Sequence, residues 1–269
     1  MSHQQYTQAA CDIARMAGGM ILSRMGTALD IQSKTQKHDY VTEVDRDAEK
    51  IIRDAIMQKF PGSRFYGEEL SSLDPAQAAD TLSSQTGDDY LWIVDPLDGT
   101  SNFIRQIPLF AVSIAVAKGN TLIAGAVYDP NRDEMFSAGK DEGAFLNGRP
   151  IRVSTVQDFS DAVISTSAPI ANPRDRAFAL GCLPGIIGAC SSMRILNCAS
   201  LCLAYVAAGR TEAHWEVGLH LWDMAAGALL IAEAGGVVNT LDGEDFGLFS
   251  TSIAACNGNA IKQSLFEKL

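Results

Sequence analysis

Apolar residues recur at helical spacing in two stretches near the start of the chain. In residues 4–26, small and apolar side chains return every three or four positions, which predicts an amphipathic helix. The same period runs through residues 45–60 and predicts a second helix, which a Pro-Gly pair at 61–62 ends. Between the two, residues 31–44 mix polar and β-branched residues, which indicates an exposed hairpin or flap. The basic residues of this flap are Lys34, Lys37 and His38.

The middle of the chain changes to the shorter apolar runs that are typical of strands. Residues 91–94 predict a short buried strand, and Pro96, which lacks a backbone donor, is expected to stop its ladder. From 111 to 147, turn signals separate successive apolar runs, which predicts an antiparallel meander. Residues 71–89, rich in Ser, Asp, Ala and Gln, are expected to form a loop with at most a helical turn.

Strands and helices alternate beyond residue 155. This change of pattern favours an α/β arrangement for residues 154–269, after helices and an antiparallel sheet in residues 1–153. No long linker divides the chain, so we expect the two parts to share an interface. The predicted elements of the second part are a strand at 162–166 and helices at 195–209 and 224–234.

Composition excludes several classes of protein. The 269 residues are 47% hydrophobic, which is enough for a large core. No apolar run approaches the roughly 20 residues of a membrane span. The N-terminus lacks the pattern of a signal peptide, which makes the cytoplasm the expected location. Six cysteines without a metal-binding spacing are expected to be free, mostly buried thiols.

The charge of the chain changes how its candidate chemistry is interpreted. A formal net charge of −11 argues against binding to nucleic acid, whose phosphates are held by Lys and Arg clusters. Yet the stretch 95–101 combines Asp95 and Asp98 with Gly99-Thr100-Ser101, which can open a helix whose first N–H groups lack partners. Carboxylates attract a phosphate only when divalent cations lie between them. The sequence therefore indicates a metal-dependent site for a small phosphate.

Four separated motifs, each with a carboxylate at the edge of an expected element, resemble the inositol monophosphatase family of lithium-sensitive, Mg²⁺-dependent phosphatases, a group that includes fructose-1,6-bisphosphatase. The resemblance spans nearly the whole chain. It implies the layered αβαβα sandwich of that superfamily, with the metal cluster between the two parts, and it implies a homodimer. The motifs are Asp39-Tyr40-Val41-Thr42-Glu43-Val44-Asp45, Gly67-Glu68-Glu69, Asp95-Pro96-Leu97-Asp98-Gly99-Thr100 and Trp222-Asp223-Met224-Ala225-Ala226-Gly227.

The resemblance implies a metal site made only of oxygen ligands. Such ligands favour two or three Mg²⁺ ions, with Mn²⁺ as an alternative, over zinc. By itself, an Asp at a strand end or a helix start is more often a cap or turn residue than a ligand; the agreement of all four motifs favours ligands here. Glu69 is expected to lie behind Glu68. The implied ligands are Glu68, Asp95, the Leu97 carbonyl, Asp98 and Asp223.

The resemblance also implies how the site acts on a phosphate ester. Thr100, held by Asp45, would orient the attacking water. Glu68 would be a ligand of the ions that activate that water. The Gly99 and Thr100 backbone N–H groups would bind phosphate oxygens. The implied substrate contacts are Asp98, Gly99, Thr100, Ala199, Glu216 and Asp223, while His220 and Trp222 are expected to pack or hydrogen-bond nearby.

The nature of the ester is less fixed by the motifs. Ser101-Asn102-Phe103 matches the inositol-type pattern, which favours inositol monophosphate or a similar small polyol or sugar phosphate. Asn197-Cys198-Ala199-Ser200 departs from the family's common Gly-Ser-Ala-Ala, and the larger Asn is expected to narrow the pocket or shift the helix start. The alternatives are histidinol phosphate, fructose 1,6-bisphosphate or phosphoadenosine phosphate, and an adaptor of the transcription machinery that retains phosphatase activity.

Overall fold

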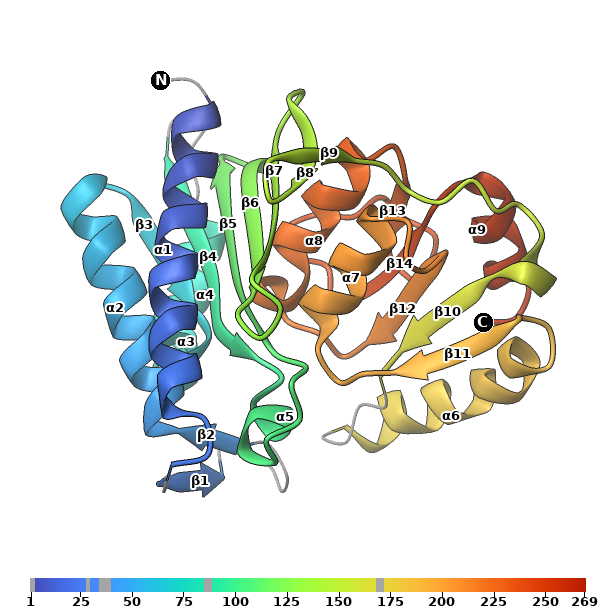
Figure 1. The fold of residues 1–269 in the computed structure, drawn as a ribbon, viewed down its shortest axis with the longest axis horizontal. Coiled ribbons are helices and arrows are strands. Elements are labelled where there is room, and N and C mark those ends of the chain that lie inside the picture. Colours follow the sequence, from blue (N-terminus) through green and yellow to red (C-terminus); the bar gives the residue numbers. More distant parts are fainter. Residues whose placement is uncertain (1–2, 28–29, 34–39, 85–88, 168–171) are drawn as a thin grey trace.

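The computed structural model describes residues 3–27, 30–33, 40–84, 89–167 and 172–269, and within them the chain forms five layers (Figure 1). Helices α1 and α2 cover one face of a seven-stranded sheet, and α7 and α8 cover its other face. A five-stranded sheet follows, with α6 and α9 on its far side. This is the predicted αβαβα sandwich, and the fold class is confirmed.

The N-terminal layer holds the two predicted helices, α1 (His3–Arg24) and α2 (Glu43–Lys59). Their buried faces form one apolar cluster with the seven-stranded sheet. The strands β1 (Ile31–Ser33) and β2 (Tyr40–Thr42) between them pair antiparallel, as expected for a hairpin. Lys34, Lys37 and His38 of the predicted flap lie outside the described residues.

The seven-stranded sheet carries the first half of the site. Its order is β3-β4-β5-β6-β7-β8-β9; β3 and β4 run parallel, and the remaining neighbours pair antiparallel, as the predicted meander requires. The strands are β3 (Arg64–Gly67), β4 (Tyr90–Asp98), β5 (Ala111–Lys118), β6 (Thr121–Asp129), β7 (Glu134–Gly139), β8 (Gly143–Leu146) and β9 (Arg149–Ile151). After β9 the chain leaves this sheet.

The five-stranded sheet has the order β11-β10-β12-β14-β13 and is parallel from β11 to β12 and antiparallel beyond. Its strands are β10 (Val163–Thr166), β11 (Ser192–Ile195), β12 (Ala213–Val217), β13 (Val237–Asn239) and β14 (Ser252–Cys256). A 3₁₀ turn (Phe159–Asp161) precedes it, and its helices are α6 (Pro173–Ile187), α7 (Ala199–Ala207), α8 (Leu221–Glu233) and α9 (Asn259–Phe266).

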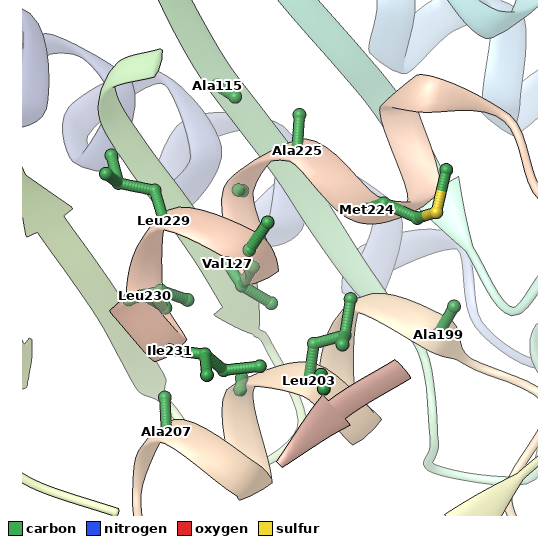
Figure 2. Packing of buried hydrophobic residues seen from close by; sticks show 14 of the residues in the cluster. Ala115, Val127, Ala199, Leu203, Ala207, Met224, Ala225, Leu229, Leu230 and Ile231 are labelled. Carbon is green, nitrogen blue, oxygen red and sulfur yellow. The ribbon is translucent and has the colours of Figure 1, made fainter. Parts of the chain in front are cut away.

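Helix α8 is packed tightly between its two neighbouring layers, and Figure 2 shows its apolar side chains facing those of α7 and the first sheet. A Cβ added at Gly125 in β6 would lie 3.2 Å from the backbone of Ala226 in α8. One added at Gly227, also in α8, would lie 2.7 Å from Leu203 Cδ1 in α7. Gly125 therefore sets how closely α8 approaches the first sheet, and Gly227 sets how closely α8 approaches α7.

Three local predictions are wrong. Residues 71–89 are not mainly a loop, because α3 (Glu68–Leu73) is followed by α4 (Pro75–Ser83), which the Asp74 carboxylate caps at the Gln77 N–H. Pro96 does not end β4; it shifts the register with β5, and pairing resumes where Asp98 faces Ala111. The helix predicted at 195–209 starts only at residue 199, because β11 extends to residue 195 and Asn197 adopts a left-handed conformation.

Two further features concern composition. Within the described residues, no helix combines the length and the apolar character that a membrane span needs. All six cysteines are free thiols, and Cys190 is the one that is only half-buried.

Candidate active site

The irregular end of β4 brings two of the predicted ligands together. The register shift with β5 falls between Asp95 and Asp98, and the chain bends there. The Leu97 N–H donates to Asp95 Oδ1 at 3.0 Å, and Asp95 is 2% exposed. The irregular segment around Pro96 therefore places the carboxylates of Asp95 and Asp98 together at the end of β4.

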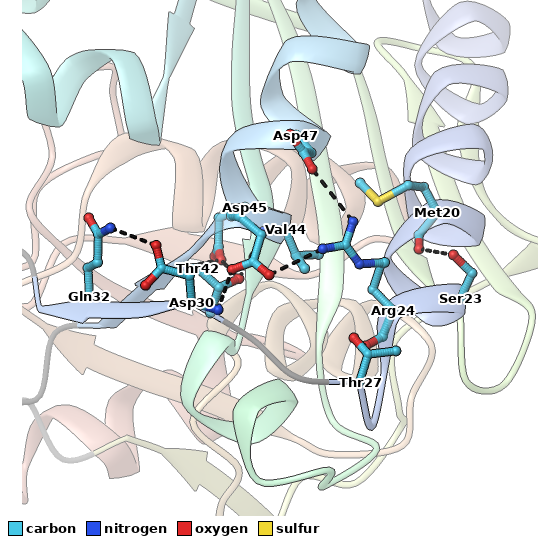
Figure 3. A network of polar contacts seen from close by, with 11 residues as sticks. Met20, Ser23, Arg24, Thr27, Asp30, Gln32, Thr42, Val44, Asp45 and Asp47 are labelled. Atoms are coloured by element: carbon cyan, nitrogen blue, oxygen red, sulfur yellow. Dashed lines mark hydrogen bonds and ion pairs between the residues drawn. The ribbon is translucent and has the colours of Figure 1, made fainter.

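Asp45 and Thr100 meet at this bend, although 55 residues separate them. The Thr100 hydroxyl lies 2.9 Å from Asp45 Oδ1 and 3.0 Å from the Leu97 carbonyl oxygen. The other Asp45 oxygen accepts hydrogen bonds from the Thr42 N–H and hydroxyl, at 2.8 and 2.6 Å (Figure 3). Burial raises the pKa of Asp45 to about 6; hydrogen bonds from Thr42 oppose this shift, and the Glu68 charge adds to it.

The first turns of α2 are held in place by a second set of polar contacts (Figure 3). Arg24 at the end of α1 donates to Glu43 at 3.2 Å and lies 3.7 Å from Asp47. Glu43 in turn accepts from the Asp30 N–H at 2.7 Å. These contacts join α1 to the start of α2, the turn that carries Asp45.

Asp98 is fixed by residues that the sequence did not assign to the site. Its Oδ2 accepts from the Ser200 N–H at 2.7 Å, from the Ser200 hydroxyl at 2.6 Å and from Cys198 Sγ at 3.2 Å. Asp98 therefore caps the first turn of α7 from across the interface between the two parts. Burial raises its pKa, and the hydrogen bonds from Ser200 oppose the shift. The sequence signal for this contact was the presence of two polar residues, Cys198 and Ser200, on either side of Ala199.

The four predicted acidic ligands form an electrostatic cluster. Burial raises the pKa of Asp95 well above its ordinary value, and the charges of Glu68, Asp98 and Asp223 raise it further. Burial also raises the pKa of Asp223 well above its ordinary value, and the charges of Asp98 and Glu68 raise it further. Within the described residues no three acidic, His or Cys side chains have the geometry of a preformed metal site. The donor chemistry fits Mg²⁺ nonetheless, because a divalent cation would cancel this repulsion between oxygen donors.

Glu68 begins α3, and a buried acid that the sequence analysis did not single out holds this helix start in place. Glu49 is 3% exposed and accepts from the Glu69 N–H at 2.8 Å and the Leu70 N–H at 2.9 Å. The carboxylate thus caps the positive end of α3. Gly67 is required beside it, since a Cβ there would collide with the Glu49 carboxylate. Glu69 is itself buried, whereas Glu68 is half-buried.

Gly99 leads from β4 into the short helix α5 (Thr100–Ile104) with φ at +90°. A Cβ at this position would lie 2.8 Å from the Leu109 carbonyl oxygen. From the same helix, Asn102 Nδ2 donates to the Leu109 and Leu196 carbonyl oxygens, each at 2.8 Å. The predicted phosphate-binding turn is therefore tied to the segment that precedes α7.

Asn197 explains how this chain differs from the common family motif. Its φ is +53°, in the left-handed region that glycine adopts freely and asparagine tolerates. Asn197 therefore forms the turn between β11 and the start of α7. Ala199 follows as the first residue of α7 and is buried.

Glu216 and Asp223 lie at the ends of β12 and α8. Glu216 is 7% exposed, and its Oε2 lies 3.2 Å from His214 Nε2. Asp223 Oδ2 accepts from the His220 N–H at 2.7 Å, which caps the start of α8. His220 stacks on Trp222 with ring centroids 4.5 Å apart, as the sequence predicted for packing residues.

Comparison with known proteins agrees with this architecture. The model of the inositol monophosphatase family matches residues 2–269. The chain is 42% identical to the Nus factor SuhB of Pseudomonas aeruginosa, over 97% of this chain and 95% of that protein. It is 41% identical to an inositol-1-monophosphatase of Rhizobium meliloti, over 85% and 82%. A crystal structure of the extragenic suppressor protein suhB from Bartonella henselae superposes with a TM-score of 0.87, 36% identity and 98% coverage of each chain. The chain belongs to the inositol monophosphatase family, a family of phosphatases.

Proposed function

We propose that this chain is a Mg²⁺-dependent phosphomonoesterase for inositol monophosphate or a similar small polyol or sugar phosphate. The observation that carries the proposal is the buried carboxylate cluster around Asp95, beside the hydrogen-bonded pair of Thr100 and Asp45. A cluster of like charges at this depth lowers stability unless cations neutralise it. Family membership supports a phosphatase that uses these charges.

The residues that would hold two or three Mg²⁺ ions are Glu68, Asp95, Asp98, Asp223 and the Leu97 carbonyl. When bound, the ions lower the pKa of a water molecule and neutralise the leaving oxygen. Mn²⁺ has the same preference for oxygen ligands and is the expected substitute.

Thr100 orients the attacking water in this mechanism. Its hydroxyl has a single proton, which Asp45 Oδ1 or the Leu97 carbonyl accepts, so its lone pairs stay available to a water. Asp45 is held by Thr42 on its other oxygen and fixes the direction of that hydroxyl. Positioning of this kind lowers the barrier without a strong local base.

The substrate would be bound from both sides of the cluster. Backbone N–H groups of Gly99 and Thr100 would bind the phosphate. Glu216 would accept hydrogen bonds from substrate hydroxyls, together with Asp98, Asp223 and the backbone of Ala199. A carboxylate that is buried and faces the site favours a polyol over an apolar leaving group.

The test is phosphate release from inositol 1-phosphate in Mg²⁺ by the wild type and by Asp98→Asn. We expect the variant to lose at least about a hundredfold in kcat, because one charge that holds a cation is removed. Asp54→Asn, an exposed Asp on α2, is the matched control and is expected to behave as the wild type. Equal release by wild type and Asp98→Asn contradicts the metal mechanism. Histidinol phosphate, fructose 1,6-bisphosphate and phosphoadenosine phosphate, assayed in parallel, decide between the alternative substrates.

A second role as an adaptor of the transcription machinery is favoured by the 42% identity to a protein named a Nus factor. We expect such a role to be independent of catalysis. Co-purification with RNA polymerase that persists in Asp98→Asn would support it, and failure of the wild type to co-purify would count against it. We also propose a cytoplasmic homodimer, which size-exclusion chromatography with light scattering tests for its oligomeric state.

A further inference from the structure

His214 is a fully buried histidine that the mechanism above does not use. It lies in β12, at the centre of the five-stranded sheet, with Ser165 of β10 beside it in register and Ala255 of β14 on the other side. Residues two apart in a strand share a face, so His214 and Glu216 point to the same side of the sheet. Cys202 of α7 also interacts with the imidazole.

An oxygen atom lies beside each ring nitrogen of His214. The Ser165 hydroxyl lies 3.2 Å from the Ala213 carbonyl oxygen and 3.1 Å from His214 Nδ1, so when it donates to the carbonyl it accepts from Nδ1. On the other side of the ring, Nε2 lies 3.2 Å from Glu216 Oε2, at ion-pair distance but without the alignment of a hydrogen bond. Burial lowers the pKa of His214, but Cys202 and Glu216 raise it to about 10.

Glu216 needs a partner of this kind. Its charge raises the pKa of both Asp98 and Asp223, so it lies close to the carboxylate cluster and is repelled by it. It is also 7% exposed, which leaves little water to stabilise the charge. A cation behind the carboxylate balances that charge and restricts where its oxygens can point.

We infer that His214 is a positioning residue that holds Glu216 as an ionised acceptor for substrate hydroxyls, and that it thereby sets the preference of the enzyme for polyol phosphates. This inference rests on the proposed function. His214 faces Glu216, the buried acid that we propose accepts from substrate hydroxyls. Ser165 contributes by fixing the ring from behind.

The test compares two esters in the intact Mg²⁺-loaded protein: inositol 1-phosphate and phenyl phosphate, whose leaving group has no hydroxyls beyond the ester oxygen. In His214→Gln we expect KM for inositol 1-phosphate to rise about tenfold, with kcat changed by less than about twofold. KM for phenyl phosphate is expected to stay within about twofold, because that ester makes no bond to Glu216.

A double-mutant cycle separates positioning from general damage. In a Glu216→Gln background, the change His214→Gln is expected to have no further effect on KM for inositol 1-phosphate. Ser165→Ala keeps the imidazole and is expected to raise the same KM by a smaller factor; it also serves as the variant to measure if His214→Gln does not fold. An equal rise in KM for both esters, or a full effect of His214→Gln in the Glu216→Gln background, would overturn the inference.

If the proposed function is wrong, the assays of the wild type show it, separately from the role of His214. A wild type that cleaves phenyl phosphate but no polyol phosphate refutes polyol specificity and this inference together. A wild type that prefers a polyol phosphate other than inositol 1-phosphate changes only the substrate. The same contrast in KM, measured with that ester, then decides the role of His214.

Discussion

Gly99 occupies a position where both the backbone and the surroundings exclude a side chain. Its φ of +90° costs other residues about 1 kcal/mol or more, and a Cβ would press against the Leu109 carbonyl oxygen at 2.8 Å. We expect Gly99→Ala to lower the free energy of unfolding by about 3 kcal/mol, the sum of strain and overpacking. Urea denaturation measures this change.

The matched control for Gly99→Ala is Gly62→Ala. Gly62 has a φ of +99°, yet nothing lies within 4 Å of a Cβ built there. Gly62→Ala therefore isolates the cost of placing a side chain on a left-handed backbone, which we expect to lower the free energy of unfolding by about 1 kcal/mol. If the two substitutions cost the same, the close approach of Leu109 contributes nothing to the stability of the turn.

At the residue scale, contacts within one motif of the site could be predicted from the sequence, and contacts between distant residues could not. Asp95 and Asp98 are three residues apart in one motif, so their proximity followed from the sequence alone. The contacts of Asp98 with Cys198 and Ser200 join residues about a hundred positions apart, and local pattern contains no information on such pairs. Asn197 was expected to narrow the pocket or to shift the helix start; it adopts a left-handed conformation between β11 and α7, and its effect on the pocket stays a prediction.

At the scale of elements, α3 depends on an acid that belongs to another helix. Glu49 of α2 accepts two N–H groups from the first turn of α3, whose first residue is the predicted ligand Glu68. We expect Glu49→Gln to lower the free energy of unfolding by about 1 kcal/mol and to weaken Mg²⁺ binding several-fold, because the Glu68 backbone loses its anchor. Thermal denaturation and Mg²⁺ titration calorimetry measure the two effects.

Asp74→Ala provides the comparison for Glu49→Gln. Asp74 caps α4 through the Gln77 N–H at 3.0 Å and is exposed, and it follows the last residue of α3 instead of holding its first turn. It is expected to cost about 1 kcal/mol of stability without a change in Mg²⁺ affinity. Unchanged Mg²⁺ binding in Glu49→Gln would mean that α3 places Glu68 without help from Glu49.

A charged pair joins the seven-stranded sheet to the turn between α7 and β12. Arg210 donates from both terminal nitrogens to Glu134 at 2.6 and 2.7 Å and lies over the Tyr205 ring, 4.9 Å from its centroid. The Arg210 hydrogen bonds lower the pKa of Glu134, and Arg132 adds to the shift. The pair is partly exposed, so we expect it to contribute about 1 kcal/mol.

The lowered pKa of Glu134 fixes the sign of a pH dependence. The folded state favours the ionised form, so the stabilisation is complete above the ordinary glutamate pKa and is lost as pH falls through the lower folded value. We expect Glu134→Gln to be less stable than the wild type at pH 7 and the difference to shrink below about pH 4. Urea denaturation between pH 3 and pH 7 measures it. A difference that grows as the pH falls would contradict the assignment.

Elements with a clear sequence pattern were predicted correctly, and short elements without one were missed. The helices α1 and α2 bury residues at helical spacing, and the strands β5 and β6 of the meander are nearly continuous buried runs between turns. In contrast, α3 and α4 are polar and short, so their residues gave no periodicity to detect. The continuation of β4 beyond Pro96 depends on pairing with β5, a tertiary contact that overrides the local effect of proline.

At the scale of the whole molecule, the close packing in the middle layer rests on glycine. Gly227 of α8 faces Leu203 of α7 so closely that a Cβ would lie 2.7 Å from its Cδ1. We expect Gly227→Ala to lower the free energy of unfolding by about 2 kcal/mol, because α7 and α8 cannot separate within their layer without disturbing the sheets on either side. Gly19→Ala, in an exposed position of α1 with nothing within 4 Å, is expected to raise it by about 0.5 to 1 kcal/mol.

These two substitutions are both glycine to alanine within a helix, so helix propensity acts on them in the same direction. Opposite signs in denaturation experiments are therefore attributable to packing. Stabilisation by Gly227→Ala would show that the α7 and α8 layer has room to separate.

The position of α8 in the middle layer has a consequence for how the protein is made. The apolar face of the first sheet that α8 covers is complete by β9, which ends at Ile151, but its cover ends only at Glu233. On the ribosome, at about 5–20 residues per second, some 80 further residues require roughly 4 to 16 seconds of synthesis. During that interval we expect the sheet to expose its apolar face to solvent and to chaperones. The layer that brings Asp223 to Asp95 thus also ends the period in which the nascent chain is most prone to aggregate.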